Sequence, residues 1–325
     1  MTKRLKDRDG RYVNYLRLSV TDRCNLRCVY CTPKNVELME HDEILRYEDM
    51  LKLAHILAKN GVEKIRLTGG EPLVRKDLSL FIKELGRIEN IDEVSITTNA
   101  TLLSDNIDSL AKAGIRRLNI SLDTLRADIY EKITGRDQFN VVMDGIKSAI
   151  ESGMNPIKIN TVLLKGINDE DLEELTSFAL QKNCHIRFIE LMPIGSKDFY
   201  EKHYLPSYYA KERIEKRFGK LWKIKSSKSA GPASMFGVEG SKGQVGFIHA
   251  MTDHFCQNCN RLRLSADGRL RPCLLKDFSI DLKELVRKEN DDIKLLKLIK
   301  EALDKKSSFH DLIPDVRTKM VSIGG

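Results

Sequence analysis

The chain has 325 residues, a formal net charge of +8 and a pI of about 9.0. Its 41% apolar and 31% charged residues are typical of a globular protein and exclude a fibrous or disordered one. The sequence has no apolar run of the roughly 18–20 residues that a membrane helix needs, and its charged start lacks the apolar core of a secretory signal. We therefore expect a cytoplasmic protein without a membrane partner. Because the positive charge is spread along the chain, it suits a nucleotide-sized anion as well as a polymer such as nucleic acid.

Strand-like and helix-like segments alternate from residue 15 to residue 191. Apolar residues repeat at helical spacing between the strands, for instance over 50–57 and 78–85, and Ser104 is the predicted N-cap of another helix. Six strand–helix units predict a parallel sheet with helices outside. A closed eight-unit barrel takes about 250 residues and only about 180 are used here. We therefore predict an α/β fold, a partial six-stranded (β/α)6 TIM-like barrel. The predicted strands are 15–20, 63–68, 93–98, 116–122, 157–163 and 185–191.

The predicted strands alternate between an apolar face and a polar face. The polar face carries Arg17, Arg66 and Lys158 among serines, threonines and asparagines. A packed barrel interior would hold Val, Ile and Leu, so this pattern predicts an interior that binds a polar ligand. The alternative is a set of internal ion pairs with Glu71 or Asp123.

The character of the sequence changes after residue 195. A helix is predicted near 207–218, loops over 225–244, a hairpin with an Asp-Gly turn over 261–273, and a last helix over roughly 281–304. We expect residues 1–195 to form the partial barrel, and residues 196–325 to form a C-terminal region that closes it and ends in a Gly-Gly tail.

Six of the seven cysteines form two groups of three. Cys24, Cys28 and Cys31 have the spacing C-x3-C-x2-C, and Cys256, Cys259 and Cys273 the spacing C-x2-C-x13-C. In a reducing compartment such clusters indicate metal binding rather than disulfides. Three thiolates can hold zinc or an iron–sulfur cluster. At the second group His249 or His254 could complete a zinc site, so zinc stays open there. The remaining cysteine, Cys184, is expected to be a small buried apolar residue.

The first cysteine motif, with an aromatic residue before its last cysteine, resembles the signature of the radical S-adenosylmethionine enzymes. The segment "TGGEP" (68–72) supports this resemblance, although alone it reads as a glycine turn before a helix. The resemblance implies that the three cysteines hold a 4Fe–4S cluster whose open iron binds S-adenosylmethionine, the source of a 5′-deoxyadenosyl radical. The residues implied to contact this cofactor are Tyr30, Gly69, Gly70, Glu71, Ser121 and Met192.

Nearly the whole chain resembles the GTP 3′,8-cyclase family, most specifically in "CQNCNRLRLSADGRLRPCL" and the terminal Gly-Gly. The resemblance implies a lyase for the first step of molybdenum cofactor biosynthesis. Hydrogen abstraction from ribose C3′ and addition to guanine C8 would give 3′,8-cyclo-7,8-dihydro-GTP. Cys256, Cys259 and Cys273 would hold a second 4Fe–4S cluster that ligates guanine. Arg17, Gly324 and Gly325 are implied in catalysis. The implied GTP contacts are Arg17, Arg66, Thr98, Lys158, Arg261 and Arg263.

The same resemblance implies several partners. An external electron donor is required, the product passes to cyclic pyranopterin monophosphate synthase, and the resemblance is consistent with a homodimer. Two other functions stay open. A different radical enzyme with an auxiliary cluster, such as a peptide-modifying one, should lack the Arg261/Arg263 pair and the terminal Gly-Gly. A zinc-ribbon nucleic-acid binder predicts bound zinc and salt-dependent binding.

Overall fold

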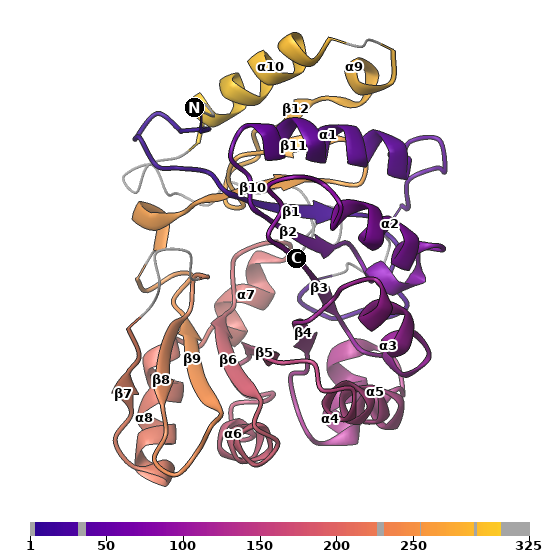
Figure 1. Ribbon diagram of the computed structural model, residues 1–325. Coiled ribbons are helices and arrows are strands. Elements are labelled where there is room, and N and C mark those ends of the chain that lie inside the picture. Colours follow the sequence, from indigo (N-terminus) through magenta and orange to yellow (C-terminus); the bar gives the residue numbers. More distant parts are fainter. Residues whose placement is uncertain (1–3, 32–36, 226–230, 254, 289–290, 307–325) are drawn as a thin grey trace.

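One open sheet forms the centre of the protein (Figure 1). The computed structural model describes residues 4–31, 37–225, 231–253, 255–288 and 291–306. Across these residues the strand order is β12-β11-β10-β1-β2-β3-β4-β5-β6-β9-β8-β7. The end strands β12 and β7 do not pair with each other within the described residues, so the sheet curves without closing.

The middle of the sheet is the predicted partial barrel. Its six strands follow one another in chain order, and every neighbouring pair is parallel. This confirms the predicted (β/α)6 arrangement, with strand ends that differ from the prediction by at most two residues. The strands are β1 (Tyr15–Ser19), β2 (Lys64–Thr68), β3 (Glu93–Thr98), β4 (Leu118–Ser121), β5 (Ile157–Leu163) and β6 (His185–Glu190).

Helices connect these strands and bury the apolar face of the sheet. Leu16, Ile65 and Ile120 on the strands are fully buried, as are Leu53 and Val142 on the helices, because alternating strand residues meet the apolar stripe of each helix. The helices are α1 (Tyr47–Lys59), the short η1 (Pro72–Val74), α2 (Leu78–Leu85), α3 (Leu103–Lys112), α4 (Ala127–Thr134), α5 (Phe139–Glu151) and α6 (Leu172–Gln181).

The predicted N-cap at Ser104 is wrong. The helix α3 begins at Leu103 with Leu102 at the cap position. Ser104 lies within the first turn, and its hydroxyl is 3.1 Å from the hydroxyl of Ser148 on α5. The side chain of Ser104 therefore contacts a neighbouring helix and does not cap the N-terminus of its own.

The C-terminal half adds strands to both edges of the six-stranded sheet. The strand β9 lies parallel beside β6, and β10 lies parallel beside β1. The predicted hairpin is confirmed, since β10 and β11 pair antiparallel around Gly268. The elements of this half are α7 (Lys197–His203), α8 (Ser207–Phe218), β7 (Trp222–Lys223), β8 (Ser234–Gly237), β9 (Gln244–Ile248), η2 (Phe255–Asn258), β10 (Arg261–Leu264), β11 (Arg269–Arg271), β12 (Ile280–Asp281), α9 (Lys283–Lys288) and α10 (Asp292–Asp304).

The single helix predicted over 281–304 is two helices. Asp291 starts the second helix, because its side chain accepts a hydrogen bond from the backbone N–H of Lys294 at 2.9 Å. This is the bonding of an N-cap residue. Figure 1 shows α9 and α10 lying across the side of the molecule formed by α1.

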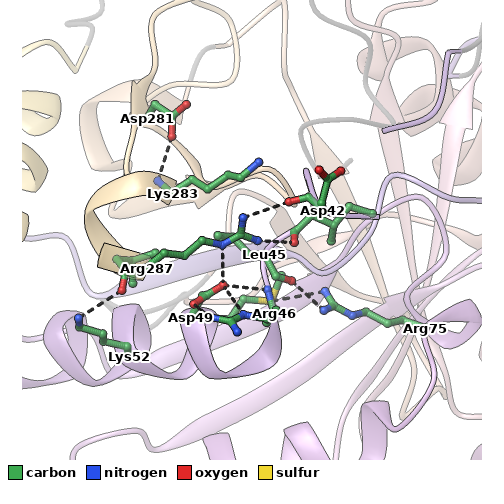
Figure 2. Close-up of polar contacts among 12 residues, drawn as sticks. Asp42, Leu45, Arg46, Asp49, Lys52, Arg75, Asp281, Lys283 and Arg287 are labelled. Atoms are coloured by element: carbon green, nitrogen blue, oxygen red, sulfur yellow. Dashed lines mark hydrogen bonds and ion pairs between the residues drawn. The ribbon is translucent and has the colours of Figure 1, made fainter. Parts of the chain in front are cut away.

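A polar network fastens α9 to the start of α1 (Figure 2). Arg287 pairs with Asp49 at 3.2 Å and donates to the carbonyls of Asp42 and Ile44, each at 3.0 Å. Arg75 donates to the next carbonyl, that of Leu45, at 2.8 Å. The segment that leads into α1 is thus held by the C-terminal half on one side and by the barrel on the other.

Candidate functional site

A cavity of about 940 Å³ opens inside the curved sheet. Its wall carries the polar and cationic side chains that the alternation along the strands predicted. The cavity runs from the N-terminal ends of the strands, at Lys64 and His185, to a rim at their C-terminal ends, at Thr68 and Ser121. Barrel enzymes build their sites at this end. The structure brings together fifteen of the predicted site residues, all of which line the cavity: Arg17, Cys24, Cys28, Tyr30, Cys31, Arg66, Gly69, Gly70, Glu71, Thr98, Ser121, Lys158, Met192, Arg261 and Arg263.

The other predicted site residues lie elsewhere. Cys256, Cys259 and Cys273 do not line the cavity, although Arg261, Arg263 and Leu274 beside them do. Gly324 and Gly325, and with them the Gly-Gly tail, lie outside the described residues.

The first cysteine loop follows β1 and is held from two sides. On the sheet side the N–H groups of Gly70 and Glu71 donate to the carbonyls of Thr21 and Arg23, each at 2.8 Å. On the outer side Arg27 and Val29 donate to the last carbonyls of α4 at 2.8 and 2.9 Å. A helix leaves these carbonyls without partners, and the loop supplies the missing donors.

The two glycines of "TGGEP" make room for this loop. A Cβ atom on Gly70 would lie 2.3 Å from the carbonyl oxygen of Arg23, and one on Gly69 would lie 2.6 Å from that of Thr21. The family resemblance implied that these glycines contact the cofactor. In the structure the space beside the glycines is filled by the backbone of the cysteine loop.

The three thiols of the first group lie close enough to affect one another. Burial raises the pKa of Cys24 and Cys28, and the neighbouring thiol of Cys31 and the carboxylate of Asp123 raise that of Cys28 further. Within the described residues no three His, Cys, Asp or Glu side chains form a site for a single metal ion. A loop that offers three thiols to an adjoining cavity fits an iron–sulfur cluster with one open iron, and the thiols lose their protons on binding it.

The second group has a different electrostatic setting. Burial and the neighbouring thiols raise the pKa of Cys256 to about 11. Burial would also raise that of Cys259, but the charges of Arg261 and Lys306 and hydrogen bonds from Arg261 lower it to about 6. Arg11 donates to the carbonyl of Cys256 at 2.6 Å. This second set of three thiols also fits a cluster.

The two histidines considered as zinc ligands are placed differently. The Nδ1 atom of His249 lies 2.5 Å from the hydroxyl of Ser207 at the start of α8. His254 lies outside the described residues.

Three arginines form a row across the cavity wall. Arg263, Arg17 and Arg66 occupy paired positions on the adjacent parallel strands β10, β1 and β2. Burial first, and then the charge of Arg263, lower the pKa of Arg17, while burial and Arg261 lower that of Arg263 to about 10. Desolvated like charges that face one another favour a bound anion.

The opposite wall adds two more cations. Burial, followed by the charges of Arg187 and Arg66, lowers the pKa of Lys158 to about 8. Arg187 was not predicted as a site residue. It is only 5% exposed, its Nη2 donates to Asn119 at 2.5 Å, and its buried Nε has no hydrogen-bond partner within the described residues. Its place in the inward register of β6, opposite Asn160, is the signal that could have revealed it.

The carboxylates at the rim hold other site residues in place. Glu71 accepts hydrogen bonds from the Thr98 hydroxyl and from the N–H of Asn99, both at 2.7 Å. Asp123 accepts from the Tyr30 hydroxyl at 2.7 Å. Burial raises the pKa of Glu71 to about 7 and that of Asp123 to about 6. Neither forms an ion pair within the described residues, so the ion-pair alternative does not account for the cations.

Comparisons with known proteins place this site in a family. A model described as the radical SAM superfamily matches residues 18–179, and one described as Molybdenum Cofactor Synthesis C matches residues 184–312. The GTP 3′,8-cyclase of Pelotomaculum thermopropionicum is 42% identical over 325 residues, covering 99% of this chain and all of the relative. That of Petrotoga mobilis is 43% identical and covers 98% and 99%. The chain belongs to the GTP 3′,8-cyclase family.

Solved structures confirm the fold. Streptococcus suis SuiB bound to S-adenosylmethionine matches with a TM-score of 0.64 at 16% identity, over 90% of this chain and 68% of that chain. Another SuiB structure, with a TM-score of 0.62, is bound to the precursor peptide SuiA. At this identity the likeness shows the fold alone, and one fold serves several functions. It is the full-length cyclase relatives that decide against the peptide-modifying and zinc-ribbon alternatives.

Family membership also confirms the predicted cofactors, 4Fe–4S clusters and S-adenosylmethionine. In the part of the chain that the structure describes, no helix is both long and apolar enough to span a bilayer.

Proposed function

We infer that this chain is a radical S-adenosylmethionine enzyme that converts GTP to 3′,8-cyclo-7,8-dihydro-GTP, the first step of molybdenum cofactor biosynthesis. One observation within the structure carries the inference. The row of Arg263, Arg17 and Arg66 lines the same cavity as the thiols of the first cysteine loop. A triphosphate is the kind of anion that several desolvated arginines suit.

Cys24, Cys28 and Cys31 would hold the first 4Fe–4S cluster, and Cys256, Cys259 and Cys273 the second. When bound, the first cluster and S-adenosylmethionine supply a 5′-deoxyadenosyl radical. The chain orients this cofactor and excludes water from the cavity. Hydrogen bonding to Asp123 fixes the Tyr30 ring at the rim. The residues proposed to contact the cofactor are Tyr30, Gly69, Gly70, Glu71, Ser121 and Met192.

The cations are proposed to neutralise the triphosphate and to position the ribose. Arg17, Arg66 and Lys158 lie on the strands of the barrel, and Arg261 and Arg263 lie on β10, next to the second cysteine group. This arrangement supports an anion site between the two cysteine groups. Thr98, whose hydroxyl donates to Glu71, Gly324 and Gly325 complete the proposed set.

The remaining assignments extend this proposal. Residues 1–195 would form the catalytic barrel and residues 196–325 the region that carries the second cluster. The enzyme would work in the cytoplasm, receive electrons from an external donor and pass its product to cyclic pyranopterin monophosphate synthase. A homodimer is compatible with this scheme.

Anaerobic reconstitution with iron and sulfide tests the proposal. Two four-iron clusters predict about eight irons per chain, together with GTP-dependent cleavage of S-adenosylmethionine. The matched variants are Cys256→Ala and, as control, Cys184→Ala at the lone cysteine. The first should lose iron and cyclisation but keep some cofactor cleavage, while the second should keep all three. About four irons, or zinc at the second site, in the unmodified enzyme would contradict the two-cluster assignment.

A further inference from the structure

A second pocket, of about 480 Å³, lies on the outer side of the first cysteine loop. Its wall combines the loop itself, the end of α4, the turn after β5 and the helix α7. We call it the outer pocket. Nothing in the proposed reaction uses it, because GTP and S-adenosylmethionine belong to the inner cavity.

The outer pocket directly adjoins the first cysteine group. Val29, which lines it, lies between Cys28 and Cys31 in sequence and donates its N–H to the carbonyl of Ile133 at 2.9 Å. Ile133 also lines the outer pocket, and it belongs to a small apolar cluster against which Tyr30 packs. Tyr30 in turn lines the inner cavity. One layer of side chains therefore separates the outer pocket from the site of the first cluster.

The rim of the outer pocket is cationic. Lys132 lies in the last turn of α4, Lys165 lies in the turn after β5, and Lys202 lies in the last turn of α7. All three are exposed, and none forms an ion pair within the described residues. By contrast, Lys197 on the same α7 pairs with Glu201 at 3.6 Å. Three unneutralised lysines from three elements attract an acidic partner.

The floor of the outer pocket is apolar and its frame is fixed. Ile167 and Phe199 pack against the same small cluster as Tyr30, and Val29 is 44% exposed. The N–H of Lys165 donates to the carbonyl of His203 at 2.9 Å, and Nδ1 of His203 lies 2.8 Å from the carbonyl of Lys165. An apolar centre within a charged rim is the anatomy of a protein interface.

We propose that the outer pocket docks an acidic one-electron donor protein and is the entry point for electrons to the first cysteine loop. The proposal rests on the proposed function, since that function requires a reduced cluster. One electron leaves the reduced cofactor of the partner and is taken up at the centre held by Cys24, Cys28 and Cys31. The partner is oxidised by one electron, and no atom is transferred.

Charge reversal on the holoenzyme tests the proposal. The test variant is Lys132→Glu/Lys202→Glu. The control is Lys112→Glu/Lys216→Glu, which changes net charge equally at exposed lysines of α3 and α8 outside the outer pocket. The probe is reduced bacterial flavodoxin, an acidic one-electron protein. Three quantities are compared: flavodoxin affinity by calorimetry, the rate of cluster bleaching by flavodoxin, and turnover with dithionite.

At low salt the test variant should bind flavodoxin on the order of tenfold or more weakly than the unmodified enzyme. Flavodoxin should also reduce it on the order of tenfold or more slowly, because steering by charge contributes factors of this size. The difference should shrink as salt rises. Dithionite-driven turnover should equal that of the unmodified enzyme, and the control should behave as the unmodified enzyme in every assay. Equal losses in both variants, or no loss in either, would overturn the docking site. Absence of GTP conversion with dithionite in the unmodified enzyme would instead overturn the proposed function.

Discussion

Arg17 on β1 and Arg263 on β10 lie side by side at paired positions of two parallel strands, although they come from opposite halves of the sequence. Both side chains are desolvated by burial, and the charge of Arg263 lowers the pKa of Arg17 further. The protein thus holds two like charges together at a place where a bound anion would relieve their repulsion.

This arrangement predicts opposite effects on binding and stability. Arg17→Ala or Arg263→Ala should weaken GTP binding by about 10- to 100-fold, the equivalent of one or two charge-assisted hydrogen bonds. The same variants should not lower the free energy of unfolding without GTP, because they remove repulsion. Calorimetry and urea unfolding measure the two quantities. Arg213→Ala is the control, since that guanidinium lies outside the cavity and pairs with Glu173 at 2.7 Å. GTP affinity that stays unchanged in both variants would argue against the proposed anion site.

Lys158 predicts how GTP binding depends on pH. Its pKa of about 8 lies below the ordinary 10.5, so the side chain is charged below pH 8 and neutral above it in the free protein. A bound triphosphate favours the ammonium, and binding above pH 8 therefore takes up a proton. The affinity for GTP should fall above pH 8, by up to about tenfold per pH unit. Calorimetry in buffers of different ionisation enthalpy measures the proton uptake. In Lys158→Arg, whose guanidinium stays charged, the fall in GTP affinity above pH 8 should disappear. If the variant shows the same fall, a group other than Lys158 causes it.

Gly70→Ala should damage the first cysteine loop. The added Cβ would meet the carbonyl of Arg23 at 2.3 Å, and this carbonyl already accepts the N–H of Glu71. Overpacking of this kind costs about 1–3 kcal/mol, and the loop must shift. We expect a folded protein with less iron at the first site, measured by iron analysis and electron paramagnetic resonance. Gly86→Ala is the control, because its Cβ would lie at an ordinary 3.6 Å from the nearest atom. Full cluster loading in Gly70→Ala would show that the cysteine loop does not need the close contact between Gly70 and the carbonyl of Arg23.

Lys306 predicts a selective effect on the second cysteine group. It is 2% exposed, and its ammonium donates to the carbonyl of Arg261 and, at 2.9 Å, to that of Pro272. These carbonyls flank Cys259 and Cys273. Lys306→Ala leaves them unsatisfied at a cost of about 1–3 kcal/mol. Iron should be lost from the second site and kept at the first, as iron analysis combined with Mössbauer spectra would show. Lys305→Ala, at an exposed neighbour, should change nothing. Equal loss from both sites would mean a general loss of stability.

Local patterns in the sequence predicted much of the site. Alternation along β1, β2 and β5 placed Arg17, Arg66 and Lys158 on the inner wall, because side-chain direction in a strand follows from position alone. Arg187 was missed although it obeys the same rule, since β6 was predicted without assigning its faces.

Contacts between distant backbone segments could not be predicted. The role of Gly70 depends on the carbonyl of Arg23, and the outer anchoring of the cysteine loop depends on the last carbonyls of α4. Backbone groups are present in every residue, so the sequence does not distinguish those that pair across the fold. The hairpin that contains β10 was predicted, but the pairing of β9 and β10 with the two edges of the six-stranded sheet was not, because it too depends on contacts between distant backbone segments.

The positions of β9 and β10 constrain how the newly made protein matures. Both edges of the six-stranded sheet are covered by strands that leave the ribosome after all six have emerged. At about 5–20 residues per second, the two edges stay open for on the order of several seconds, and open edges invite pairing with other chains. The first cysteine loop is complete during this interval, yet the wall formed by β10 is missing. Metallocentre assembly should therefore follow the end of translation, and cells that overproduce the chain need protection of these edges as well as a supply of iron.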